Sequence, residues 1–269
     1  MSKILEHRDD VSQLCKELFE NAPITYFEYA RYYFDGTFFE INTNASITKA
    51  YLENDSYPSL KEFAVNKSKF VCFSRDIELP YPAKAATGKY LENISIFESF
   101  DIKHRIYIDQ AGEDYFDCCG FGTNLSFPNT MVYYLNNLDF LDLFRKNFLK
   151  QNQKILQNMH NNRIQLFTGD DIADPNIIKA NEIIQSQKFT LEKFNVSIQK
   201  VLPKTNFSAK EFLCIQHSAH GKTAKETGQA LGVSYRTIEK HWQNIREKTG
   251  VNQKSGVIDL YWWLFDSKK

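Results

Sequence analysis

Between Ser208 and Gly250 the chain repeats one local pattern three times: a capping residue, a short segment and a glycine. Two of the capping residues, a serine and a threonine, are followed three residues later by glutamate, as in a capping box. A glycine after each segment allows the left-handed conformation that commonly ends a helix. The three segments are Ser208 to Gly221, Thr223 to Gly232 and Ser234 to Gly250. Three short helices joined by such tight turns predict a helix-turn-helix unit.

The third segment has two contrasting sides. At about 100° per residue, Ile238, Trp242 and Ile245 share one side, which we expect to face the core. The opposite side offers lysine and arginine for phosphates and guanine, glutamine for adenine, and a carboxylate for cytosine. Its residues are Arg236, Lys240, Gln243 and Glu247, with Glu239 on the shoulder. A solvated helix surface would also mix these charges, so the face alone leaves both interpretations open.

The surrounding motif favours nucleic-acid recognition. The stretch AHGKTAKETGQALGVSYRTIEKHWQNIREKTGV, within residues 207–266, resembles the helix-turn-helix domain of LuxR/FixJ-type bacterial transcription regulators. The resemblance implies DNA contacts at Thr223, Tyr235, Arg236, Thr237, Glu239, Lys240, Gln243 and Lys248. Glu239 departs from the family, which usually carries a basic residue there, and Lys240 could take over part of that role. His241 is interpreted as a packing residue.

The last predicted helix, SGVIDLYWWLF, is apolar on nearly every side. One small bundle would not bury so much apolar surface, which favours a partner. In the family this helix pairs two DNA-binding domains, which implies dimerisation through Val257, Ile258, Tyr261, Trp262 and Leu264. The alternative is that these residues pack on the chain's own N-terminal domain.

Charge and composition agree with a regulator of this kind. The 33 basic and 33 acidic residues balance overall, but from Pro203 onward 11 basic residues face 6 acidic ones. A basic end suggests a polyanionic partner. The absence of a run of about 18 apolar residues, the charged N-terminus and five cysteines without metal-ligand spacing predict a cytoplasmic protein outside the membrane. Ser, His and Asp lack a nucleophile-elbow or phosphate-loop setting, so we predict no enzyme.

The N-terminal part predicts an α+β domain. Two aromatic segments, 24–34 and 37–43, flank Asp35-Gly36, a dipeptide typical of hairpin turns. A second hairpin is predicted around residues 111–114. Further strands are predicted at 68–75 and 129–135, and helices at 10–21, 44–54, 136–161 and 176–185. Together they predict an antiparallel sheet between helices, an α-β-α sandwich of PAS-like or autoinducer-binding-like type.

The signal that this domain senses is not evident from the sequence. Asp9-Asp10 precede a helix without the strand that a phosphate-receiver domain requires. The quorum-sensing members of the family use tryptophans around their ligand, and all three tryptophans here lie in the last 30 residues. An apolar ligand pocket could be lined by Tyr26, Tyr29, Phe39 and Tyr51, or these residues could simply form an aromatic core. No metal or other cofactor is predicted.

The sequence therefore predicts three regions: a sensory α+β domain (1–165), a connector with a helix (166–203) and a four-helix LuxR-type helix-turn-helix domain (204–269). The predicted function is a transcription regulator that binds double-stranded DNA as a homodimer. RNA polymerase and a small-molecule effector are expected as further partners. The alternative is an interaction protein whose helix-turn-helix unit docks on another protein.

Overall fold

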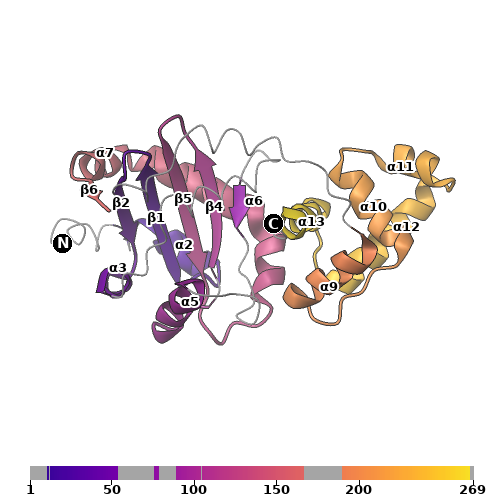
Figure 1. Cartoon of the computed structure of the whole chain (residues 1–269), viewed down its shortest axis with the longest axis horizontal. Coiled ribbons are helices and arrows are strands. Elements are labelled where there is room, and N and C mark those ends of the chain that lie inside the picture. The colour runs from indigo at the N-terminus through magenta and orange to yellow at the C-terminus, as the bar shows by residue number, and fades with distance from the viewer. Residues whose placement is uncertain are drawn as a thin grey trace. The chain divides into compact units, whose positions relative to one another are not determined.

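The computed structural model describes residue 11 and residues 13–53, 76–78, 89–103, 105–166 and 190–266. Their contacts divide the chain into two compact units (Figure 1). The first comprises Met1–Thr130 with Asp139–Ile184, and the second Met131–Leu138 with Gln185–Lys269. Helix α6 (Thr130–Gln151) crosses this division, and its backbone leaves helical dihedral angles at Asn137.

The first unit is built on one sheet. Its strands are β1 (Tyr26–Tyr33), β2 (Thr37–Asn42), β3 (Asp76–Glu78), β4 (Arg105–Ala111), β5 (Tyr115–Gly122) and β6 (Ile164–Gln165). Each pairs antiparallel with its neighbour in the order β3-β4-β5-β1-β2-β6. The predicted hairpins β1–β2 and β4–β5 are both present. At the first turn Gly36 has a φ of 84°, a conformation that glycine adopts without steric cost.

Strand alternation sends neighbouring side chains to opposite faces of the sheet. Tyr26 and Phe38 share one face, where they pack with residues of helices α3 (Ala45–Glu53) and α5 (Lys89–Ser99). Phe27 points to the other face and contacts the rings of Phe144 and Phe148 on α6. Helices α2 (Lys16–Asn21) and α7 (Gln153–Asn161) complete this unit. The predicted layered α+β fold is confirmed.

One predicted strand is wrong. Residues 129–135 open the long helix α6 instead, which extends N-terminally the helix that we predicted from residue 136. The helical spacing of buried Tyr134, Leu138 and Leu141 continues the pattern further along the chain. Short apolar runs do not separate a strand from a buried helix. The predicted strand 68–75 and helix 176–185 lie outside the described residues.

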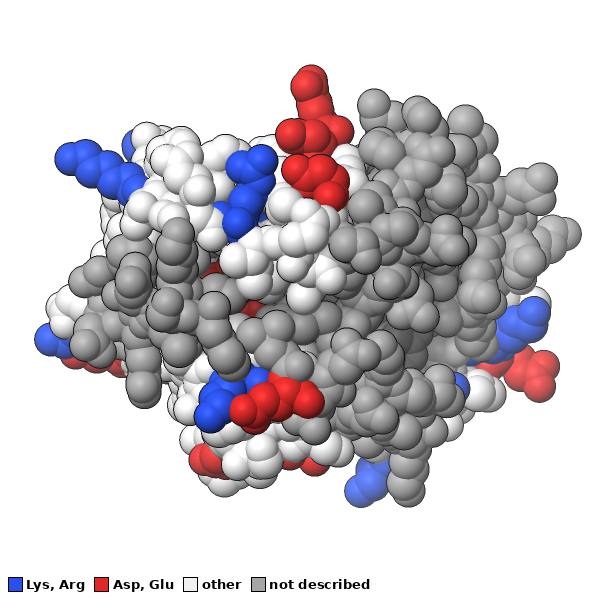
Figure 2. All heavy atoms as spheres, turned by 60° about the vertical axis from the view of Figure 1, so that its left-hand side comes forward, with Lys and Arg blue, Asp and Glu red and all other residues white. Residues whose placement is uncertain are grey.

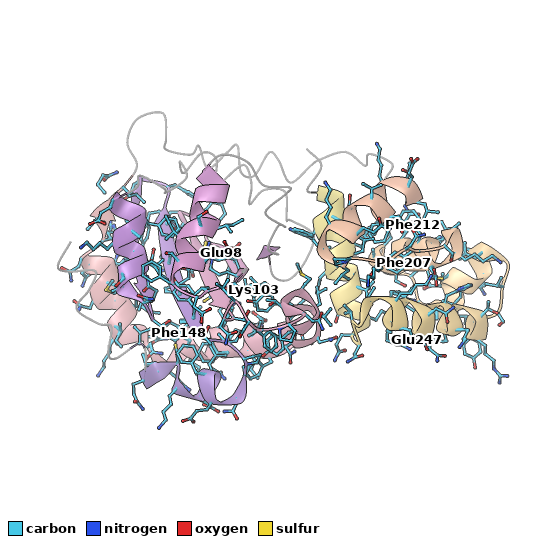
Figure 3. All side chains as sticks on the ribbon, turned by 90° about the horizontal axis from the view of Figure 1, so that it is seen from below. Glu98, Lys103, Phe148, Phe207, Phe212 and Glu247 are labelled. Carbon is cyan, nitrogen blue, oxygen red and sulfur yellow. The ribbon has the colours of Figure 1, made fainter. Side chains whose placement is uncertain are left out.

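The second unit is helical. It contains α9 (Leu191–Val201), α10 (Ala209–Ala219), α11 (Ala224–Leu231), α12 (Tyr235–Thr249) and α13 (Lys254–Asp266). Phe194 of α9 packs against Phe207, Phe212 and Tyr261, with ring centroids 5.3–5.6 Å apart. Phe207 and Phe212 point into this bundle in Figure 3. Helix α9 lies within the predicted connector, yet its aromatic side chain belongs to the core of the C-terminal helices.

Candidate nucleic-acid interface

Local hydrogen bonds begin each helix where the sequence predicts. Ser208 accepts a hydrogen bond from the Glu211 amide while the Glu211 side chain accepts from the Ser208 amide. Thr223 and Glu226 form the same reciprocal capping box at α11. Ser234 caps α12 by accepting from the Thr237 amide at 3.1 Å. These caps satisfy amides that a helix N-terminus otherwise leaves unpaired.

Glycines end the same helices. Gly221, Gly232 and Gly250 have φ values of 80°, 65° and 70°, in the left-handed region. The turn between α11 and α12 also requires Gly228, because a Cβ there would lie 2.7 Å from the Val233 carbonyl oxygen. The Val233 amide donates to the Gly228 carbonyl at 2.9 Å, so the turn is hydrogen-bonded back to α11. The turn thereby fixes how α12 leaves α11.

Helix α12 buries Ile238, Trp242 and Ile245 and exposes a single stripe, as predicted. We call this stripe the reading stripe; it consists of Tyr235, Arg236, Glu239, Lys240, Gln243 and Glu247. Tyr235 is 55% exposed, an unusual exposure for so large a side chain, at the first turn of the helix. Figure 3 shows Glu247 on the outer side of the helical unit.

Three members of the reading stripe are linked. Lys240 Nζ donates to Gln243 Oε1 at 3.1 Å, and Gln243 Nε2 donates to Glu247 Oε1 at 2.9 Å. All three residues are exposed, so such bonds are individually weak and can exchange for contacts with a ligand. The stripe can therefore present donors and acceptors in a row to a polar partner such as base edges.

Two electrostatic contacts involve residues of α12 outside the reading stripe. In one, Lys248 Nζ lies 2.7 Å from Glu211 Oε2, a carboxylate only 4% exposed. Burial alone would raise the pKa of Glu211, but hydrogen bonds from Lys248 and Ser208 outweigh it and hold the pKa below its ordinary value. In the other, Lys254 Nζ lies 4.8 Å from the Trp242 ring centroid. Burial lowers the pKa of Lys254 and Glu239 opposes that shift.

The eight predicted DNA-contact residues thus fall into two groups. Five of them lie on the reading stripe, and Thr223 is exposed at the start of α11. Thr237 is half-buried, and its hydroxyl lies 2.9 Å from that of the capping residue Ser234. Lys248 is tied to Glu211 and to the Asn206 carbonyl. Thr237 and Lys248 therefore help to position α12, in addition to any contact that they make with DNA.

Sequence reasoning passed over a group of basic side chains near Thr223. His217 lies on the last turn of α10 and His220 is its C-cap residue, while Lys222 lies in the turn and Lys225 at the start of α11. Lys225 lies within the stretch that resembles the family, but the resemblance implies no DNA contact for it. Because these side chains lie outside the recognition helix, its periodicity could not reveal them.

On the face of the molecule in Figure 2, the described acidic and basic side chains are interspersed.

The predicted dimerisation residues of α13 differ in exposure. Val257, Tyr261 and Leu264 are at most 3% exposed, and the Tyr261 ring contacts Phe194 and Phe212. Ile258 and Trp262 are half-buried. Much of this apolar helix is therefore used inside the chain, which leaves Ile258 and Trp262 as the accessible part of the predicted set.

The predicted ligand-binding residues do not share one site. Tyr26 and Tyr51 pack together in the core under α3 and α5, whereas Tyr29 and Phe39 contact each other on the opposite face, at 6.0 Å. The first face also holds a buried polar group: the Tyr26 hydroxyl donates to Glu28, and Arg105 lies 3.6 Å from Glu28. Among the described residues, no group of three or more His, Cys, Asp or Glu could hold a metal ion.

The family model of bacterial regulatory proteins of the luxR family matches residues 205–261. This match covers α10, α11, α12 and most of α13, and it includes every residue of the reading stripe. Residues 205–261 form a LuxR-type domain. The resemblance that the sequence motif indicated is confirmed.

The comparison with solved structures covers more of the chain at low similarity. A crystal structure of Escherichia coli SdiA aligns with 95% of this chain and 88% of its own, at 12% identity and a TM-score of 0.36. SdiA in complex with octanoyl-rac-glycerol aligns with 95% and 86%, at 11% identity and a TM-score of 0.30. A comparison with curated proteins gave no match. In the described part of the chain, no helix is long and apolar enough to cross a membrane.

Proposed function

We propose that the protein is a transcription regulator that binds operator DNA as a homodimer through its LuxR-type domain. In this proposal the sheet domain senses a small molecule and RNA polymerase is a further partner. The observation that carries the proposal is the reading stripe: an exposed, hydrogen-bonding face on the second helix of a helix-turn-helix unit. The second helix of such a unit enters the major groove, and the first crosses the backbone.

Different residues of the reading stripe suit different parts of the DNA. Arg236 and Lys240 can pair with guanine or with phosphates, and Gln243 can pair bidentately with adenine. Glu239 and Glu247 accept hydrogen bonds only, which suits the amino group of cytosine and disfavours phosphates. A stripe with two basic and two acidic residues adds little net attraction to DNA. It therefore suits specificity more than affinity.

A selection experiment tests this proposal. Duplexes that the full chain enriches from a random-sequence pool provide the operator, and affinity is measured against salt concentration. We expect the logarithm of affinity to fall with the logarithm of salt by about 0.9 per neutralised phosphate. Arg236→Ala and Lys240→Ala should each weaken operator binding by roughly 1–3 kcal/mol. Lys200→Ala, an exposed lysine of α9, is the matched control.

The outcomes separate DNA binding from protein docking. Equal affinity of wild type and both stripe variants for the selected duplex would refute recognition through α12. Failure to enrich any sequence, together with salt-independent retention, would favour the alternative in which the stripe docks on another protein.

We place the proposed small-molecule site on the face of the sheet that carries Tyr26 and Tyr51. Buried charges are costly unless paired, and they gather at functional sites. This face buries Glu28 beside Arg105, while the hydroxyl of Tyr51 lies 3.4 Å from the Arg105 guanidinium. Native mass spectrometry of the purified chain tests the proposal, since a carried molecule adds a discrete mass. Tyr51→Phe should lower the occupancy of that molecule, whereas Tyr29→Phe on the opposite face should not.

A further inference from the structure

The corner between α10 and α11 gathers positive and titratable side chains. His217 and His220 are one turn apart at the end of α10, and Lys222 follows directly after Gly221. Backbone bonds fix this corner: the Lys222 amide donates to the His217 carbonyl, and the Gly221 amide to the Ser218 carbonyl, both at 3.0 Å. The backbone that carries these three side chains is therefore fixed by the turn.

The ring of His220 has a defined orientation. Its Nδ1 lies 2.7 Å from the Gln216 carbonyl oxygen, which only accepts, so Nδ1 carries the proton. The ring also packs on Trp262, at 5.3 Å between centroids, and Trp262 Nε1 donates to the Ala219 carbonyl. With Nδ1 used in this way, Nε2 is the ring nitrogen that remains for a contact with a ligand. His220 is exposed, so Nε2 can become a donor to an anion when it is protonated.

The groups around His217 disfavour its charged form in the free protein. Burial, then Lys222, then His220 lower the pKa of His217. Nearby, Lys225 adds positive charge, and the carboxylate of Glu226 is occupied by the amide and hydroxyl of Thr223. Helix α13 contributes Trp262 to this corner and carries Asp259 one turn earlier. An anion placed here would reverse the balance and favour imidazolium.

We propose that His217, His220 and Lys222 form a proton-linked clamp for a DNA backbone phosphate. The inference rests on the proposed DNA binding and deepens it, since the first helix of a helix-turn-helix unit crosses the backbone and Thr223 opens that helix. Phosphate binding draws a proton onto the clamp, so DNA affinity rises as pH falls through the histidine range. Lys222 supplies a further positive charge to the clamp.

The test measures operator affinity of the full chain at constant salt between pH 8 and pH 6. We expect wild-type affinity to rise by about three- to tenfold, which is less than the roughly hundredfold limit for one proton taken up over these two pH units. Calorimetry in buffers of different ionisation enthalpy should show proton uptake on binding. The double variant His217→Gln/His220→Gln should lose both signals. His241→Gln, a half-buried histidine of α12, should keep them.

If the double variant fails to fold, the Lys222→Gln variant provides a second test. Lys222 is exposed, so this substitution should leave the fold intact. It should reduce the salt slope of binding by about 0.9. Salt-dependent binding with no proton uptake, or uptake that survives in the double variant, would overturn the clamp while the proposed function stands. Failure of the wild type to bind any selected duplex would instead refute the proposed function.

Discussion

At the scale of single residues, burial changes what a charged side chain can do. Lys248 was predicted as a DNA contact, and its ammonium group also completes a pair with the buried carboxylate of Glu211. A Lys248→Ala variant would weaken the domain as well as any DNA contact. Arg236 and Lys240 are exposed and cleaner probes of binding. A substitution at an exposed residue without a buried partner therefore tests DNA binding, whereas one at Lys248 also tests the stability of the domain.

The Glu211–Lys248 pair predicts acid sensitivity of the LuxR-type domain. The folded-state pKa of Glu211 lies below its ordinary value of 4.5, so the pair stabilises the fold above that value. This contribution is lost as pH falls through the lowered pKa. Glu211→Gln retains a side chain suited to the capping box and should cost about 1 kcal/mol near neutral pH.

Urea unfolding followed by tryptophan fluorescence at several pH values measures this loss. The glutamine variant should show a flatter dependence of unfolding free energy on pH between about 6 and 3 than wild type. Glu192→Gln, an exposed acid of α9, is the control. Parallel pH curves for wild type and the Glu211 variant would show that the pair contributes nothing.

At the scale of elements, the α11–α12 turn depends on the missing side chain of Gly228. Alanine normally favours a helix over glycine by about 1 kcal/mol. Here the added methyl group would meet the Val233 carbonyl oxygen at 2.7 Å, a backbone atom that cannot move without opening the turn. Such overpacking costs roughly 1–3 kcal/mol, so the clash outweighs the propensity.

Gly228→Ala should therefore lower the melting temperature of the tryptophan-detected transition and weaken operator binding. Gln229→Ala changes the neighbouring exposed position and should leave both close to wild type. Unchanged melting in the Gly228 variant would mean that the turn relaxes at little cost.

At the scale of the whole molecule, the two compact units should unfold as separate cooperative regions. All three tryptophans, Trp242, Trp262 and Trp263, lie in α12 and α13. Tryptophan fluorescence thus reports the helical unit, whereas far-ultraviolet circular dichroism reports both. We expect the two urea transitions to differ in midpoint or slope. Superimposable curves would indicate one cooperative molecule instead.

The proposed homodimer is also a property of the whole molecule. Ile258 is half-buried on α13, so a charge there should disfavour association more than folding. Ile258→Asp should shift sedimentation equilibrium toward monomer while tryptophan emission stays native. Ser255→Asp places the same charge at an exposed position of the first turn and should leave association unchanged. Association that survives Ile258→Asp would place the contact on another surface.

The sequence by itself determined the boundaries of α10, α11 and α12 and the exposed side of α12. These features depend on neighbours within about one helical turn, such as Ser208 with Glu211 or Gly250 after Thr249. The two hairpins followed from turn dipeptides and alternation in the same way. Residues 129–135 were assigned wrongly because a short apolar run fits either kind of element.

Tertiary structure alone decided the partners that are distant in sequence. Glu211 and Lys248 lie 37 positions apart, and no local pattern in the sequence indicates that their side chains meet. The same holds for Phe194 of α9, which joins the C-terminal core. Local periodicity fixes which side of an element is apolar. Which other element covers that side depends on how the whole chain packs.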